Sequence, residues 1–244
     1  MSGNWKMYKT PAETTDFFER FRGLVEQSTH CEIVICPPFT SLATAVDLAK
    51  GTRIQIGAQN IAWAKEGAFT GEISGPMIGA VGATYTLVGH SERRHYFCET
   101  DETVLKRTQA ALEAGLTPIV CVGERLEERE SGNTEKVLVS QCIGGIAGLS
   151  EAQFAKIVIA YEPVWAIGTG KTATPEIAAD AHRVIRNEVR TRFGKEAAEA
   201  VRILYGGSVK PDNVKTLMAQ PEIDGSLVGG ASLDPVSFAS IVNF

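Results

Sequence analysis

The sequence predicts a single (β/α)8 barrel spanning residues 1–244. Short apolar segments alternate eight times with longer amphipathic segments, and no linker or low-complexity segment interrupts the series. The apolar segments are nearly continuous, which is typical of strands in a parallel sheet that is covered on both faces. Barrels of this kind usually have about 250 residues, which is close to the length of this chain.

The eight expected strands are spread evenly along the chain. In order they are SGNWKM, CEIVICPP, RIQIGAQN, YTLVGH, TPIVCVG, KIVIAYEPV, RILYGGS and GSLVGG, at residues 2–7, 31–38, 53–60, 85–90, 117–123, 156–164, 202–208 and 225–230. Helical patterns lie between them, for example at residues 100–115, which end on Gly115, and at residues 174–194. The latter begin with Thr174 as the expected N-cap and Pro175 in the first turn.

An open, doubly wound sheet is the alternative fold. It normally carries a Gly-x-Gly-x-x-Gly pattern directly after the first strand. Residues 3–10 of this chain read GNWKMYKT and lack that pattern. The closed barrel is therefore the favoured prediction.

Composition excludes several functional classes. The chain is 44% apolar and 22% charged with a net charge of −5, so we expect neither a nucleic-acid partner nor a membrane partner. No apolar run is long enough to span a bilayer, and no charged-then-apolar leader begins the chain. The cysteines show no Cys-x-x-Cys pair and no metal-ligand spacing with the histidines, which predicts reduced thiols in a cytoplasmic protein without a metal. They are Cys31, Cys36, Cys98, Cys121 and Cys142.

Polar residues and glycines follow the expected strands, at the end of a barrel where enzymes of this fold carry their chemistry. They are Asn4, Lys6, Gln59, Asn60, His90, Glu92, Cys121, Glu124, Glu162, Gly206, Gly207, Ser208, Gly229 and Gly230. Taken singly, the lysine could be a solvated surface residue, the histidine a structural one and the glycines tight turns. Together they supply a base, an electrophile and a phosphate site, so their shared position predicts an active site.

The segment AIGTGKT at residues 166–172 has two interpretations. A phosphate-binding loop of the Gly-x-x-x-x-Gly-Lys-Thr type would need its first glycine where this chain has Trp165, and the acidic Glu162 would repel a polyphosphate. The favoured interpretation is a hinged lid in which Gly168 offers its N–H to a phosphate. The expected lid consists of Pro163, Val164, Trp165, Ala166, Ile167, Gly168, Thr169, Gly170, Lys171, Thr172 and Ala173.

Six motifs, in order along the chain, carry a resemblance to a known family. They are GNWKM, VGHSERR, VCVGE, AYEPVWAIGTGKTAT, YGGSV and VGGASL. The sequence resembles the triosephosphate isomerases, so the resemblance implies a TIM barrel and the interconversion of dihydroxyacetone phosphate and D-glyceraldehyde 3-phosphate. It further implies a place in glycolysis and gluconeogenesis, a homodimer, and no cofactor or metal.

The resemblance also assigns roles to individual residues. It implies that Glu162 is the base that moves the proton, that His90 is a neutral electrophile, and that Lys6 and Asn4 contact the substrate and its developing charge. The implied phosphate-binding residues are Gly168, Ser208, Gly229 and Gly230, and the implied dimer contacts are Phe69 and Thr70. Glu92 matches an acidic residue beside the site. A short helix after His90 should keep its ring neutral, as in that family.

The start of the chain departs from the family pattern, and two functions other than isomerisation remain as alternatives. Family members usually carry several apolar residues before GNWK, where this sequence has only Met1 and Ser2, so we expect an effect on the length and stability of the first strand. An aldolase-type lyase would need a Schiff-base lysine, for which Lys6 is the candidate. A phosphate-binding protein without catalysis would not need Glu162 and His90 together.

Overall fold

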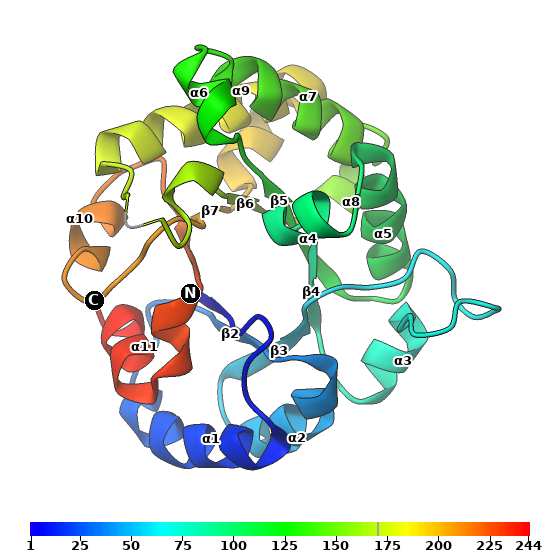
Figure 1. Ribbon diagram of the computed structural model, residues 1–244, viewed down its shortest axis with the longest axis vertical. Helices are drawn as coiled ribbons and strands as arrows, with labels where there is room; N and C mark the ends of the chain where they lie inside the picture. The colour runs from blue at the N-terminus through cyan, green and yellow to red at the C-terminus, as the bar shows by residue number, and fades with distance from the viewer. Residues whose placement is uncertain (170) are drawn as a thin grey trace.

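The computed structural model describes residues 1–169 and 171–244. Parallel strands β1 to β8 form a closed barrel in chain order, and β8 pairs with β1 to complete it. Helices surround the strands as an outer ring (Figure 1). The predicted fold is therefore confirmed. The strands are β1 Ser2–Asn4, β2 Ile33–Cys36, β3 Ile54–Ala58, β4 Tyr85–Val88, β5 Thr117–Val122, β6 Val158–Tyr161, β7 Ile203–Tyr205 and β8 Gly225–Val228.

The helices begin at residues with strong local signals. Thr10 caps the first helix and forms a reciprocal capping box with Glu13. Thr174 is the predicted N-cap, and its hydroxyl accepts the Ile177 N–H at 3.3 Å. The helices are α1 Pro11–Val25, α2 Phe39–Ala49, α3 Gly75–Ala80, α4 Ser91–Tyr96, α5 Asp101–Glu113, α6 Leu126–Glu130, α7 Thr134–Ile146, α8 Glu151–Phe154, α9 Pro175–Ala200, α10 Val214–Met218 and α11 Pro235–Val242, with 3₁₀ turns η1 Val164–Ala166 and η2 Gly230–Leu233.

Strand β1 is short but paired on both edges. Gly3 is in register with Ile35 of β2 and with Val228 of β8. Just beyond the strand, the fully buried indole of Trp5 donates a hydrogen bond to the Ser232 carbonyl at 3.0 Å. The short first strand therefore closes the barrel and positions the residues that follow it.

The core has two parts. A small cluster of buried residues belongs to the strands alone, and its members alternate along them, as inward-facing barrel residues do. A larger cluster combines strand and helix residues, including the aromatic group of Phe17, Phe18 and Phe21 on α1. The smaller cluster contains Val34, Cys36, Tyr85, Leu87, Ile119, Cys121, Val158, Ala160, Leu204 and Leu227.

Two further features are the state of the cysteines and the apolar character of the helices. All five cysteines are free, as predicted. Within residues 1–169 and 171–244, no helix has both the length and the apolar character needed to cross a membrane.

A fully buried histidine on α9 should make stability depend on pH. His182 hydrogen-bonds the Glu222 carbonyl through Nδ1 at 3.0 Å and packs edge-on against Tyr161. Burial lowers the pKa of His182 to about 3, whereas an unfolded histidine has its ordinary value of 6.5. Between these pH values the unfolded chain binds more protons, so the free energy of unfolding should fall by roughly 1 kcal/mol for each pH unit below 6.5.

The variant His182→Asn isolates this contribution. Asparagine does not titrate in this range, so its free energy of unfolding should depend less steeply on pH between 6.5 and 4.5 than that of the parent. Urea unfolding at several pH values measures both slopes, and the titration of all other groups cancels in their difference. Parallel slopes would show that His182 does not carry the effect.

Candidate active site

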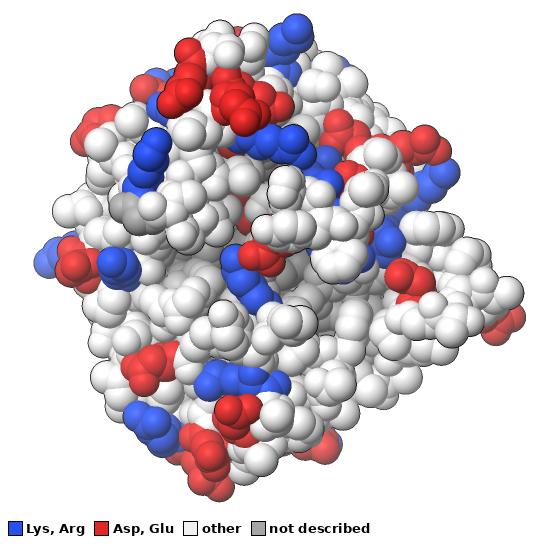
Figure 2. Space-filling model, in the orientation of Figure 1, with Lys and Arg blue, Asp and Glu red and all other residues white. Residues whose placement is uncertain are grey.

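The residues that the sequence singled out meet at one end of the barrel. Asn4 ends β1, Lys6 and His90 follow β1 and β4 by two residues, and Glu162 directly follows β6. A cavity of about 380 Å³ opens there, and a basic and an acidic side chain lie together beside the central hollow in Figure 2. Among the residues that line the cavity are Asn4, Lys6, His90, Glu162, Gly168, Ser208, Gly229 and Gly230. The structure thus brings together every predicted catalytic and phosphate-binding residue.

The Glu162 carboxylate is only 2% exposed and has three polar contacts. It lies 2.8 Å from Nε2 of His90, and it accepts hydrogen bonds from the Ser91 N–H at 2.9 Å and from the Ser91 hydroxyl at 3.2 Å. Burial raises the pKa of Glu162, but His90, the Ser91 N–H and Lys6 together bring it below its usual value. The carboxylate is therefore ionised and able to accept a proton at neutral pH.

His90 lies at the start of α4, as predicted, but its pKa shift differs from the prediction. Its Nδ1 accepts the Glu92 backbone N–H at 3.3 Å, so Nε2 carries the proton shared with Glu162. Burial is the largest influence and lowers the pKa of His90. The charge and hydrogen bond of the Glu162 carboxylate, together with the charge of Glu92, outweigh burial, so the pKa lies above its ordinary value. The expectation that the helix start keeps the pKa low is wrong for this arrangement, because the carboxylate contacts the ring directly.

Removing the charge of Glu162 should reverse this shift. In Glu162→Gln the largest raising influence disappears, and burial then dominates. We expect the pKa of His90 to fall below that of the parent, as measured by NMR titration of the ring protons. An unchanged or higher pKa in the variant would contradict the assignment of the shift to Glu162.

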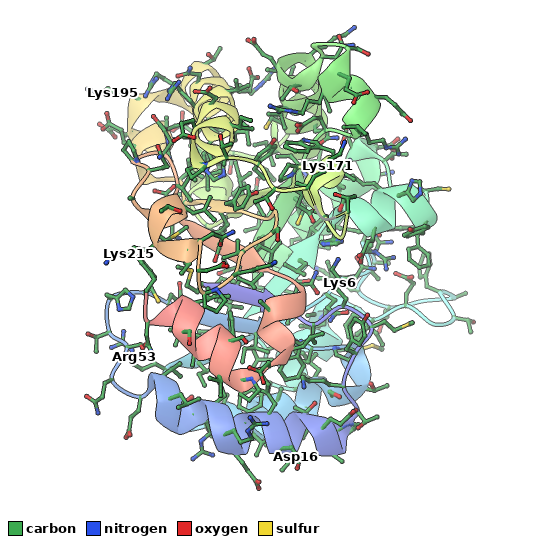
Figure 3. The ribbon with its side chains drawn as sticks, turned by 60° about the vertical axis from the view of Figure 1, so that its left-hand side comes forward. Lys6, Asp16, Arg53, Lys171, Lys195 and Lys215 are labelled. Atoms are coloured by element: carbon green, nitrogen blue, oxygen red, sulfur yellow. The ribbon has the colours of Figure 1, made fainter. Side chains whose placement is uncertain are left out.

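Lys6 is held by its neighbours in an uncommon backbone conformation. Its φ is +51°, which non-glycine residues rarely adopt. The Lys6 N–H donates to Oδ1 of Asn4 at 2.9 Å, and Nε2 of Gln59 donates to the Lys6 carbonyl at 2.8 Å. The Lys6 ammonium lies 2.5 Å from Oε1 of Glu92, which gives that acid a defined position beside the site. In Figure 3, Lys6 and Lys171 lie on the same side of the molecule.

Backbone turns supply the candidate anion site. Ser208 follows the glycine pair after β7, and Gly229 and Gly230 follow β8 where η2 begins. A side chain at Gly207 would meet the Tyr205 hydroxyl at 2.2 Å, so only glycine fits there. Exposed backbone N–H groups at such turns are suited to bind a phosphate.

The sequence analysis missed three site residues. Tyr8 and Lys210 line the cavity, and Ser91, which directly follows His90 in the sequence, bonds Glu162.

The predicted lid begins next to Glu162 and is anchored at its start. The Trp165 indole donates to Oε1 of Glu124 at 2.8 Å, and the same oxygen accepts the Tyr161 hydroxyl at 3.1 Å. Ala166, Ile167 and Gly168 line the cavity, whereas Lys171, Thr172 and Ala173 do not. Gly170 lies outside the described residues. A nucleotide-binding loop would need a glycine in place of the bulky Trp165, and the negative charge of Glu162 would repel a polyphosphate. That alternative is therefore rejected.

Two predicted residues lie away from the cavity. Phe69 and Thr70 are exposed on the long loop between β3 and α3, which projects from the barrel in Figure 1.

In the described ranges, no group of three or more His, Cys, Asp or Glu residues is placed to hold a metal ion.

Comparisons with known proteins agree with this geometry. The triosephosphate isomerase family profile matches residues 1–244. The chain is 78% identical to a triosephosphate isomerase of Solibacter usitatus over 244 residues, which cover all of this chain and 98% of that protein. It is 54% identical to one from Citrifermentans bemidjiense and 53% identical to one from Moorella thermoacetica, each alignment covering all of this chain and 97% of the relative. With this fold, this cavity and these relatives, the chain belongs to the triosephosphate isomerase family.

Proposed function

We propose that this protein interconverts dihydroxyacetone phosphate and D-glyceraldehyde 3-phosphate through an enediolate, in glycolysis and gluconeogenesis. The observation that carries the proposal is the buried Glu162 carboxylate 2.8 Å from His90 Nε2, in one cavity with Lys6 and the glycine turns. A proton next to a carbonyl is weakly acidic, so its removal needs a base together with donors to the carbonyl oxygen. This cavity supplies both without a cofactor.

Each group has one role in the proposed reaction. Glu162 takes the proton from one carbon of the substrate and returns it to the neighbouring carbon. His90 and Lys6 donate to the substrate oxygens, where negative charge develops. Oδ1 of Asn4 accepts the backbone N–H of Lys6 and so holds Lys6 in place. The N–H groups of the phosphate-binding residues, which are Gly168, Ser208, Gly229 and Gly230, hold the phosphate.

An isomerisation assay with borohydride trapping tests the proposal. The purified protein is incubated with dihydroxyacetone phosphate, and formation of D-glyceraldehyde 3-phosphate is followed with a coupled dehydrogenase. We expect turnover and no covalent adduct after borohydride treatment. A substrate adduct on Lys6 would favour a Schiff-base lyase instead, and phosphate binding without turnover would favour a non-catalytic protein.

We further propose that the triose phosphate and a second copy of this chain are its partners, rather than a nucleic acid or a membrane. The net charge of −5 disfavours binding to nucleic acid or anionic lipid. A cytoplasmic location is supported by the five free cysteines, because thiols remain reduced there.

Exposed apolar residues on the segments that follow β1, β3 and β4 support the homodimer. Trp63 of the projecting loop stacks with Arg107, and Phe97 stacks with Arg93. The buried Glu99 carboxylate lies 2.5 Å from Arg93 and 3.4 Å from Arg107, so it joins these two regions. Exposed large apolar side chains that gather on a surface are typical of an interface. Its exposed members are Met7, Tyr8, Trp63, Phe69, Met77, Val81, Tyr96 and Phe97.

A charge at the loop tip should break the dimer and lower activity. In the proposed assembly Phe69 and Thr70 dock beside the cavity of the second copy. Phe69→Glu should therefore sediment as a monomer and lose most of its turnover. Val236→Glu, at an exposed apolar position on α11, is the matched control and should remain dimeric and active. A fully active monomer would refute the dependence on assembly.

A further inference from the structure

At the end of β5, the edge that faces β4 is bonded by side chains from two helices instead of by a neighbouring strand. Strand β4 pairs with β5 only as far as Val120. Beyond that point, Nη2 of Arg94 donates to the Cys121 carbonyl at 3.3 Å. Gln141 of α7 then makes two hydrogen bonds with Gly123: its Oε1 accepts the Gly123 N–H at 2.7 Å, and its Nε2 donates to the Gly123 carbonyl at 3.2 Å. The side-chain amide thus substitutes for the missing neighbouring strand.

On its other edge, the same part of β5 holds the backbone of the proposed base. The Glu162 N–H donates to the Val122 carbonyl at 2.7 Å, and the Val164 N–H donates to the Glu124 carbonyl at 3.1 Å. Gly123 lies between these two bonds, and its own N–H and carbonyl are directed away from β6, toward Gln141. Glu162 is therefore attached to a segment whose far side is fixed by one side chain.

The contact between Gly123 and Glu162 is direct. A Cβ atom at Gly123 would lie 1.7 Å from the Glu162 carbonyl oxygen, which is the shortest such approach among the described glycines. A shift of Gly123 toward Glu162 would therefore displace the Glu162 backbone, and any shift of residues 122–124 strains the hydrogen bonds that join them to Glu162 and Val164. Since the carboxylate is itself buried, a displaced backbone changes where its oxygen atoms lie.

We infer that Gln141 is a positioning residue for catalysis: by fixing the Gly123 peptide group, it holds Glu162 at the distance at which it can remove the substrate proton. The inference rests on the proposed isomerase function. A displacement of 1 Å at a reacting group costs about 10²-fold in rate. Three of the four proposed phosphate-binding residues, Ser208, Gly229 and Gly230, follow β7 and β8. Both hydrogen bonds of the Gln141 side chain described above are with Gly123, so substrate affinity should be largely preserved.

A purely structural role makes a different prediction. If Gln141 only fastened α7 to the barrel, its replacement would lower the melting temperature and leave the turnover of the folded protein unchanged. The two roles are therefore separated by comparing kcat with KM in folded protein.

The experiment compares Gln141→Leu and Gln141→Glu with a matched control. Leucine removes both hydrogen bonds at similar volume, whereas glutamate keeps the acceptor for the Gly123 N–H and loses the donor. Asn243→Leu likewise removes two side-chain hydrogen bonds where α11 meets the end of α1: Nδ2 donates to the Leu24 carbonyl at 3.0 Å, and Oδ1 accepts the Ser28 hydroxyl. The measurements are kcat, KM for dihydroxyacetone phosphate, inhibition by inorganic phosphate, and hydrogen exchange of the Gly123 amide.

We expect kcat to fall about 10- to 100-fold in Gln141→Leu and less in Gln141→Glu, with KM and phosphate inhibition close to those of the parent. Exchange of the Gly123 amide should accelerate in the leucine variant, and Asn243→Leu should keep its kcat. A folded Gln141→Leu with kcat within twofold of the parent would overturn the inference. If that variant does not fold, an unchanged kcat in Gln141→Glu together with faster amide exchange would overturn it. An inactive parent would instead refute the proposed isomerase function.

Discussion

Replacing Glu162 with glutamine should lower kcat by about 10²–10⁴-fold. Glutamine has nearly the same shape and can still accept the Ser91 N–H that the carboxylate accepts at 2.9 Å. It does not take up a proton under these conditions, so general-base catalysis is lost, which corresponds to about 3–5 kcal/mol of activation free energy. KM should change little, because the substitution removes none of the proposed phosphate contacts, which are the N–H groups of Gly168, Ser208, Gly229 and Gly230.

Steady-state assays of dihydroxyacetone phosphate isomerisation measure this effect. Glu130→Gln, at an exposed acid on α6, is the matched control and should have the kcat of the parent. The melting temperature of each variant establishes that the protein is folded. A Glu162→Gln variant that turns over within a few-fold of the parent would remove Glu162 from the role of base.

Deleting residues 167–170 should cause a large loss of isomerisation and a new side reaction. An enediolate phosphate that is open to water can expel its phosphate, so an isomerase must keep the intermediate covered. Ile167 and Gly168 line the cavity, whereas Trp165 at the lid's start stays anchored to Glu124. The shortened protein should therefore retain the base but lose the cover, and release inorganic phosphate with methylglyoxal.

Both products are measured after the shortened variant is incubated with dihydroxyacetone phosphate. The parent and an enzyme-free sample are the references. If isomerisation falls but no more phosphate appears than in the enzyme-free sample, the segment acts in some way other than covering the intermediate. If isomerisation is unaffected, the segment is not a lid.

Much of the fold could be predicted because its signals are local. The continuous apolar runs that became β5 and β6 identify buried parallel strands, and Thr174 with Pro175 identifies the start of α9. The length of β1 was harder to predict. The strand ends at Asn4 after three residues, because Trp5 and Lys6 make contacts with distant segments instead. Pairing on both edges, which the local sequence does not encode, determines that β1 still closes the barrel.

The candidate site could be located from strand ends, since the barrel brings those ends together whatever the spacing between them in the chain. Contacts that a side chain makes with a distant element were not predictable in this way. Trp165 with Glu124 and Gln141 with Gly123 join segments whose separate patterns give no sign of the other partner. The pKa of His90 was predicted with the wrong sign for the same reason, because the distance from its ring to Glu162 outweighs the effect of the local helix.

Deuterium exchange into the substrate tests the central claim that Glu162 moves a proton of the triose phosphate. Dihydroxyacetone phosphate is incubated in D₂O with the parent or with Glu162→Gln, and its C1 protons are followed by NMR. The account predicts that the parent incorporates deuterium at C1 as it isomerises the substrate, and that Glu162→Gln incorporates it at least about 10²-fold more slowly. Exchange at the parental rate in Glu162→Gln would contradict it.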